Sequence, residues 1–126
     1  TCQGRWWPET DFGNAFHMFR ELGQTASGDP LTLQALTAIH LSHRVIAIVV
    51  LLYVGWLALR AMRTDGARGV GRALLAVLLV QFGLGLANVA FSLPLALAVA
   101  HNGGAALLLA LVTVLNYRAV RAGYRI

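Results

Sequence analysis

The sequence predicts an all-α membrane protein in which an outer loop, residues 1–35, precedes a bundle of transmembrane helices, residues 36–126. Of its 126 residues, 58% are hydrophobic and 12% are charged, and the mean hydropathy is +0.67. This composition is too apolar for an ordinary soluble domain. Three apolar runs, residues 36–59, 73–93 and 95–117, are each long enough to cross a bilayer core, which needs about 20 residues. Three helices enclose a core poorly and four enclose it well, so the chain is expected to be a fragment of a longer protein whose fourth helix lies upstream.

The outer loop is polar and rich in glycine and proline, but part of it has a helical pattern. The residues that recur at helical spacing are Phe12, Ala15, Phe16, Phe19 and Leu22. They predict a short amphipathic helix in the membrane interface, with Trp6 and Trp7 as interfacial anchors. A helix packed against its own loop is the alternative. His17, among the phenylalanines, is expected to be structural or solvated.

Arginines flank the spans. Four lie in residues 60–72 (Arg60, Arg63, Arg68 and Arg72) and three at the C-terminus (Arg118, Arg121 and Arg125). Because cytoplasmic segments carry the excess of arginine, both regions are expected on the cytoplasmic side and residues 1–35 outside. The arginines do not alternate with aromatic residues in one patch, so the sequence favours a lipid bilayer as partner and argues against nucleic acid.

Two histidines lie inside the predicted spans at matching depth. His43 is about seven residues into the first span and His101 about six residues into the third, each about 10 Å below the outer end at about 1.5 Å per residue. A histidine in a membrane is costly unless it pairs, lines a polar path or binds a metal. The two spans run in the same direction, so both imidazoles can reach one iron. This predicts a six-coordinate, low-spin haem suited to electron transfer.

Two neighbours of His43 extend this prediction. Arg44 can pair with a haem propionate, or reach lipid phosphate instead. His40 lies one turn before His43 on nearly the same face, as a hydrogen-bond partner, a proton carrier or an alternative ligand. Zinc is disfavoured because no carboxylate or thiol lies at that depth. The alternative for all three histidines is hydrogen bonding between helices.

Small residues accompany the polar positions of the second and third predicted spans. They are Gly103, Gly104, Ala105 and Ala106 after His101, and Gly83 and Gly85 beside Gln81 and Asn88. Small side chains allow a flat ring or a neighbouring helix to come close. For the glycines alone, ordinary helix packing is the favoured interpretation.

The remaining sequence argues against catalysis within this segment. No span contains a carboxylate, so no buried acid–base pair is available. No phosphate-binding loop and no GxSxG motif is present. Cys2 is the only cysteine, and it is either an inert thiol or the partner of a cysteine upstream of Thr1.

Three motifs together resemble a known family. They are Cys-Gln-Gly-x-Trp-Trp-Pro at residues 2–8, His-x-x-His-Arg at residues 40–44 and His-x-Gly-Gly at residues 101–104. The combination resembles haem A synthase, and more narrowly the C-terminal half of the proteobacterial form. The resemblance covers nearly the whole chain.

The resemblance implies an eight-helix protein of two similar four-helix halves. It implies an oxidoreductase that oxidises the methyl group of haem O to the formyl group of haem A. The C-terminal half is expected to hold a cofactor haem b and to relay electrons, and the N-terminal half to hold the substrate haem O. His43 and His101 match the axial ligands, and Cys2 matches the second cysteine of an outer-loop disulfide. The substrate half of the family carries a catalytic glutamate where this chain has His40, so this segment by itself is expected not to be catalytic.

The implied location is the bacterial cytoplasmic membrane, with the N-terminal loop in the periplasm and the C-terminus in the cytoplasm. Haem O synthase, oxidase assembly factors and a second copy of the chain remain open as partners. Two other functions also remain open from the residues alone. One is a bis-histidine b-type cytochrome subunit for quinol or respiratory electron transfer, and the other is a haem-free membrane scaffold.

Overall fold

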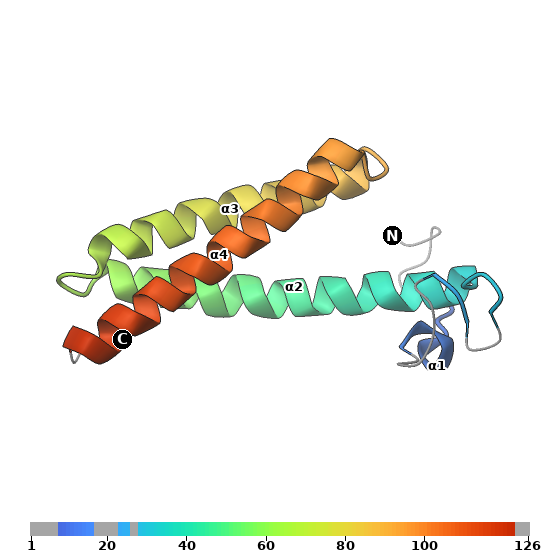
Figure 1. Cartoon of the computed structure of the whole chain (residues 1–126), viewed down its shortest axis with the longest axis horizontal. Helices are drawn as coiled ribbons and strands as arrows, with labels where there is room; N and C mark the ends of the chain where they lie inside the picture. Colours follow the sequence, from blue (N-terminus) through green and yellow to red (C-terminus); the bar gives the residue numbers. More distant parts are fainter. Residues whose placement is uncertain (1–7, 17–22, 26–27, 123–126) are drawn as a thin grey trace. The chain divides into compact units, whose positions relative to one another are not determined.

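The computed structural model describes residues 8–16, 23–25 and 28–122, and within them the chain is helical with no strand (Figure 1). The helices are α1 (Phe12–Ala15), α2 (Leu33–Met62), α3 (Arg68–Ala90) and α4 (Leu95–Ala122). The last three are long and apolar enough to cross a membrane. The predicted fold class, an all-α membrane protein with three spans, is confirmed.

The spans are longer than predicted, because the arginines do not end the helices. The connection between the first two spans is reduced from residues 60–72 to residues 63–67. Arginine is a good helix former, and its long side chain reaches polar surroundings from a helix end. The guanidinium of Arg60 lies 5.8 Å from the ring centre of Trp56, and Arg68 pairs with Asp65 at 3.2 Å. Gly66 makes the turn with φ +83°, a conformation that favours glycine.

The chain divides within α2 into two units, Thr1–Ile48 and Val49–Ile126, and each is described by itself. In the first unit, Ala15, Ala35 and Ala38 are buried. Asp11 caps α1, since its Oδ1 accepts a hydrogen bond from the Asn14 backbone N–H at 3.0 Å.

The predicted interfacial helix is only partly described. Its described part, α1, is four residues long, and the chain bends at Phe16. Phe12 and Phe16 are exposed with their rings stacked 6.4 Å apart. Several other predicted residues lie outside the described residues: Cys2, Trp6, Trp7, His17, Phe19 and Leu22.

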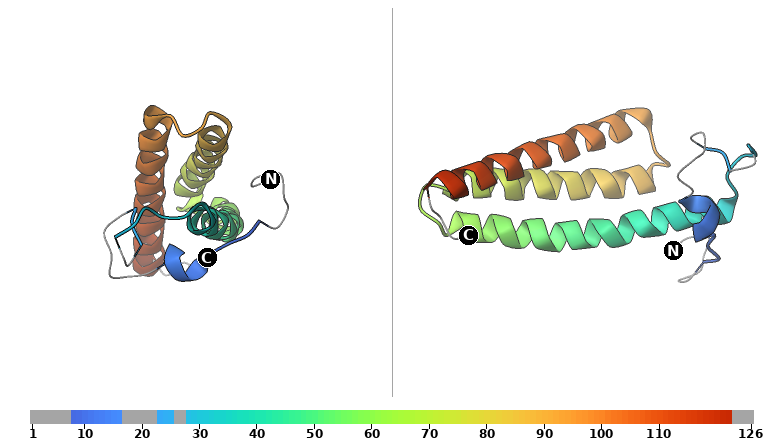
Figure 2. Two further views of the ribbon diagram at one scale, coloured as in Figure 1. Left: turned by 90° about the vertical axis from the view of Figure 1, so that its right-hand side faces the viewer. Right: turned by 60° about the horizontal axis from the view of Figure 1, so that its bottom comes forward.

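In the second unit, α3 and α4 form an antiparallel hairpin whose helices lie side by side (Figures 1 and 2). Residues 91–94 connect them, at the boundary between the predicted spans 73–93 and 95–117. Ser92 and Leu93 adopt left-handed φ angles of 58° and 57°. The Leu93 N–H donates to the Asn88 carbonyl oxygen at 2.8 Å, which satisfies one of the free carbonyl groups at the end of α3.

The core of the second unit is small. Its buried members are Ala58, Ala61, Ala67, Val70, Leu74, Leu78, Leu108 and Leu115. Most of the other large apolar side chains on these helices are exposed. A soluble protein of this size would bury far more apolar surface, whereas spans in a bilayer can present theirs to lipid. The packing therefore agrees with membrane-spanning helices.

Candidate functional site

His101 lies where α4 packs against α3. Its side chain is half-buried, and its Nδ1 atom is buried. A Cβ atom added to Gly85 of α3 would lie 3.2 Å from the His101 Cε1 and 3.8 Å from its Nδ1. The edge of the imidazole that carries Nδ1 and Cε1 therefore rests on α3 at a position without a side chain.

Gln81 lies one turn before Gly85 on α3 and contacts the same part of α4. Its Nε2 donates a hydrogen bond to the backbone carbonyl oxygen of His101 at 2.8 Å. Its Oε1 lies so close to Gly104 that a Cβ atom there would overlap it. The Gln81 amide is thus held between His101 and Gly104.

Asn88 provides a further polar contact nearer the turn. Its side chain is 8% exposed, and its Nδ2 donates to the Leu97 carbonyl oxygen at 3.5 Å, the long limit for such a bond. The Asn88 Oδ1 and the Gln81 Oε1 are buried and have no hydrogen-bond partner among the described residues. Unsatisfied amide oxygens are costly in an apolar environment, so this part of the hairpin is more polar than packing requires.

These contacts form one seam, defined here as Gln81, Gly85 and Asn88 of α3 with Leu97, His101 and Gly104 of α4. Positions four and three residues apart share a helix face, so each set of three lines one side of its helix. An imidazole fixed in such a seam can serve as a metal ligand, since the neutral ring binds haem iron through one nitrogen.

The other predicted site residues lie in the first unit. His40, His43 and Arg44 are on α2, and all three are exposed. His40 precedes His43 by three residues, so both lie on nearly the same face of α2, as predicted. That His43 and His101 hold one iron stays a prediction. Among the described residues, no group of three or more His, Cys, Asp or Glu side chains gathers around a common point.

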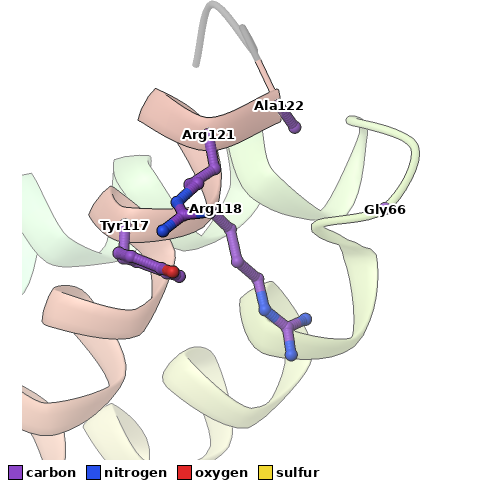
Figure 3. A pocket seen from close by; sticks show the side chains of 5 residues that line it. All are labelled: Gly66, Tyr117, Arg118, Arg121 and Ala122. Atoms are coloured by element: carbon purple, nitrogen blue, oxygen red, sulfur yellow. The ribbon is translucent and has the colours of Figure 1, made fainter.

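A hollow of about 370 Å³ lies at the other end of α4 (Figure 3). It is lined by Gly66, Tyr117, Arg118, Arg121 and Ala122. The Arg121 guanidinium lies 5.1 Å from the ring centre of Tyr117. Arg118 follows His101 by 17 residues, or about 25 Å along a helix, so this basic hollow is separate from the seam.

Sequence reasoning noted every residue of the seam except Leu97 but missed their contacts. Gln81 and Asn88 were expected only to stand beside glycines, and neither was assigned to His101. A usable signal was present, because in an antiparallel hairpin the residues equidistant from the turn face each other. Asn88 and Leu97 are equidistant from the centre of the 91–94 connection, as are Gln81 and Gly104.

Comparisons with known proteins agree on one family. The family model described as cytochrome oxidase assembly protein matches residues 1–113. The heme A synthase of Shewanella oneidensis is 34% identical over 116 residues, which cover 92% of this chain and 35% of that protein. The heme A synthase of Rhodospirillum centenum is 39% identical over 83 residues, 64% of this chain and 22% of that protein. The heme A synthase of Bradyrhizobium sp. is 40% identical over 70 residues, which cover 53% of this chain and 19% of that protein.

The matches cover most of this chain but only a part of each relative. The chain spans about a third of the length of the Shewanella protein, and less of the other two. No solved structure matches the chain.

Proposed function

Because the chain belongs to the haem A synthase family of cytochrome oxidase assembly proteins, we propose that it is the part of such an enzyme that binds a cofactor haem b. Membership places the chain in haem A biosynthesis and in an oxidoreductase-type family. In the proposed full-length enzyme, the methyl group of haem O is oxidised to the formyl group of haem A. The spans of this chain contain no carboxylate, which supports electron relay here and oxidation elsewhere in the protein.

The observation that carries the proposal is the placement of His101. Its imidazole is held in the α3–α4 seam, and Gly85 leaves the space that the ring occupies. Imidazole is a common axial ligand of haem iron, and the long apolar helices around it suit a flat, mostly apolar ligand. The imidazole of His101 in the seam therefore fits the role of an axial ligand of a haem iron.

We assign the second imidazole to His43 of α2. Arg44, its neighbour, is the proposed partner of a haem propionate, because a guanidinium pairs well with a carboxylate. His40, one turn away, is the proposed hydrogen-bond partner or proton carrier. When bound, the haem supplies one-electron transfer. The protein positions the two imidazoles and neutralises the propionate.

We propose the bacterial cytoplasmic membrane as the location, with residues 1–35 in the periplasm and the end of α4 in the cytoplasm. The hollow in Figure 3 supports placing the 63–67 connection and the C-terminal end of α4 on the same side of the membrane. Its lining combines Gly66 of that connection with Arg118 and Arg121 of α4. Excess arginine marks the cytoplasmic side. Lipid surrounds the helices, and haem O binds the other half of the full-length protein.

The test is haem retention by the full-length protein that contains this chain. His43→Ala and His101→Ala are each expected to remove one low-spin b-type signal from the reduced-minus-oxidised spectrum. Asn102→Ala, an exposed neighbour of His101, is the matched control and is expected to retain it. Full retention of that signal in His101→Ala would contradict the proposed function.

A further inference from the structure

The imidazole of His101 has one edge against α3 and one edge away from it. The Nδ1–Cε1 edge rests on Gly85, and Nδ1 is buried. A nitrogen buried between two helices cannot bind an iron without a shift of the ring. A haem iron bound by this imidazole in the observed orientation would therefore be ligated through Nε2, the ring nitrogen farther from Gly85.

Gln81 fixes the backbone that carries this ring. Its Nε2 bonds to the His101 carbonyl oxygen at 2.8 Å, while its Oε1 fills the space left by the missing side chain of Gly104. One side chain of α3 therefore touches two positions of α4 that lie about one turn apart. This contact opposes both rotation of α4 about its axis and sliding along α3.

Packing alone does not explain an amide at position 81. A leucine would fill a similar volume without leaving a buried acceptor, and the Gln81 Oε1 has no hydrogen-bond partner in the described part of the chain. A side-chain hydrogen bond between spans stabilises them only modestly, because the amide also finds partners in the alternative state. The bond to His101 gives the amide a specific purpose, which is to set the position of this turn.

We propose that Gln81 and Gly85 are positioning residues for His101, which select its Nε2 for the iron and set the plane of its ring. This inference rests on the proposed function, in which His101 is an axial ligand. Gly85 determines the orientation of the ring, and Gln81 determines the height and rotation of the turn that bears it. Neither residue is itself a proposed ligand of the iron.

The test compares glycine variants in the full-length protein with haem bound. Gly85→Ala places a Cβ 3.2 Å from the His101 Cε1, so the ring must move by a few tenths of an ångström. Gly83→Ala, two residues away on α3, adds a Cβ with nothing within 4 Å and is the matched control. The readouts are the principal g values of the ferric low-spin haem and carbon monoxide binding to the ferrous protein. The haem concerned is identified by the loss of its signal in His101→Ala.

Gly85→Ala is expected to shift the largest g value and to make at least a tenth of this haem reactive with carbon monoxide, because a displaced ligand is more easily replaced. Gly83→Ala is expected to match the parent protein in both readouts. A role in packing alone would lower the unfolding temperature without changing the g values. Parent-like g values and no carbon monoxide binding in Gly85→Ala would overturn the proposal.

Gln81→Leu gives a second test that adds no volume at the ring. It removes the bond to the His101 carbonyl oxygen, and a partial shift in the same direction as Gly85→Ala is expected. Gln81→Glu keeps the length of the side chain and, when protonated, a donor, so it is expected to restore most of the parent spectrum. If Gly85→Ala does not accumulate, parent-like spectra in Gln81→Leu overturn the proposal by themselves.

The two possible failures are distinguishable. If His101→Ala removes the haem signal while the Gly85 and Gln81 variants are unchanged, the proposed function stands and the positioning role is wrong. If His101→Ala keeps the signal, the proposed function itself is wrong.

Discussion

Gly71 of α3 lies directly against the backbone of Ala58 of α2. A Cβ added to Gly71 would lie 2.9 Å from the Ala58 carbonyl oxygen and 2.7 Å from the Met62 backbone nitrogen. Backbone atoms of a helix cannot move aside as a flexible side chain can. This contact therefore limits how closely the two helices approach at the end next to the 63–67 connection.

Gly71→Ala is expected to destabilise the protein for this reason. Overpacking costs about 1–3 kcal/mol, and the better helix propensity of alanine recovers at most about 1 kcal/mol. We expect a net loss of about 1–2 kcal/mol, measured as the free energy of unfolding in detergent. Gly69→Ala, on the same helix with nothing within 4 Å of the added Cβ, is the control and is expected to be neutral or stabilising. Equal stability of the two variants would show that this contact yields at little cost.

Arg44→Gln is expected to lower the midpoint potential of the haem. In the proposed site Arg44 lies near a haem propionate, and removing its positive charge favours the oxidised form of the haem, which carries one more positive charge. A partly screened charge pair contributes up to about 1 kcal/mol, which corresponds to a decrease of up to about 40 mV for one electron. Arg44→Lys keeps the charge and is expected to stay near the parent potential. An unchanged potential in Arg44→Gln would favour the alternative partner, lipid phosphate.

Membrane orientation is testable with single thiols. In a Cys2→Ser background, Ser92→Cys in the 91–94 connection is expected to react with a membrane-impermeant maleimide added to intact spheroplasts. Thr64→Cys in the 63–67 connection is expected to react only after permeabilisation, because the proposed topology places that arginine-rich end in the cytoplasm. The opposite labelling pattern would invert the proposed topology.

Ionisation of Asp11 makes the stability of α1, in the first unit, depend on pH. The Asn14 backbone N–H, followed by the Asn14 side chain, lowers the pKa of the Asp11 carboxyl below its ordinary value of 3.8. Both bonds favour the ionised form. The capping contribution to α1 is therefore fully present above pH 3.8 and is lost as the pH falls through the lowered pKa.

Carboxyl-carbon NMR of the protein in nanodiscs measures this pKa directly. Asn14→Ala removes the side-chain bond but keeps the backbone bond, so the pKa is expected to rise only part of the way toward 3.8. An Asp11 pKa at or above 3.8 in the parent protein would contradict the capping geometry.

Much of the fold was predictable because the bilayer restricts it. An apolar run that crosses a membrane must be helical, since only a helix or a closed barrel satisfies its backbone groups there. All three spans were therefore located by the apolar runs in the sequence, which are residues 36–59, 73–93 and 95–117. Their ends were less predictable, because arginine near the interface is compatible with both a helix and a loop, and α2 and α3 extend into the arginine-rich region.

The position of the turn between α3 and α4 was predictable, because Pro94 lies between the apolar runs at residues 73–93 and 95–117. Its form was not, because nothing about Leu93 predicts its left-handed backbone. That conformation arises because the Leu93 N–H must reach back to the Asn88 carbonyl oxygen at the end of α3.

The sequence by itself determined that the chain is a membrane protein with three helical spans, and that histidines lie within two of them. Both the hydrophobic length of a span and the cost of a polar residue inside it depend on composition along the chain. Only the tertiary structure decided which edge of His101 is covered, that Gln81 holds its backbone, and that Gly71 sets a helix contact. Those facts depend on the rotation of one helix against another. Side-chain contacts between helices fix that rotation, and no single apolar run encodes it.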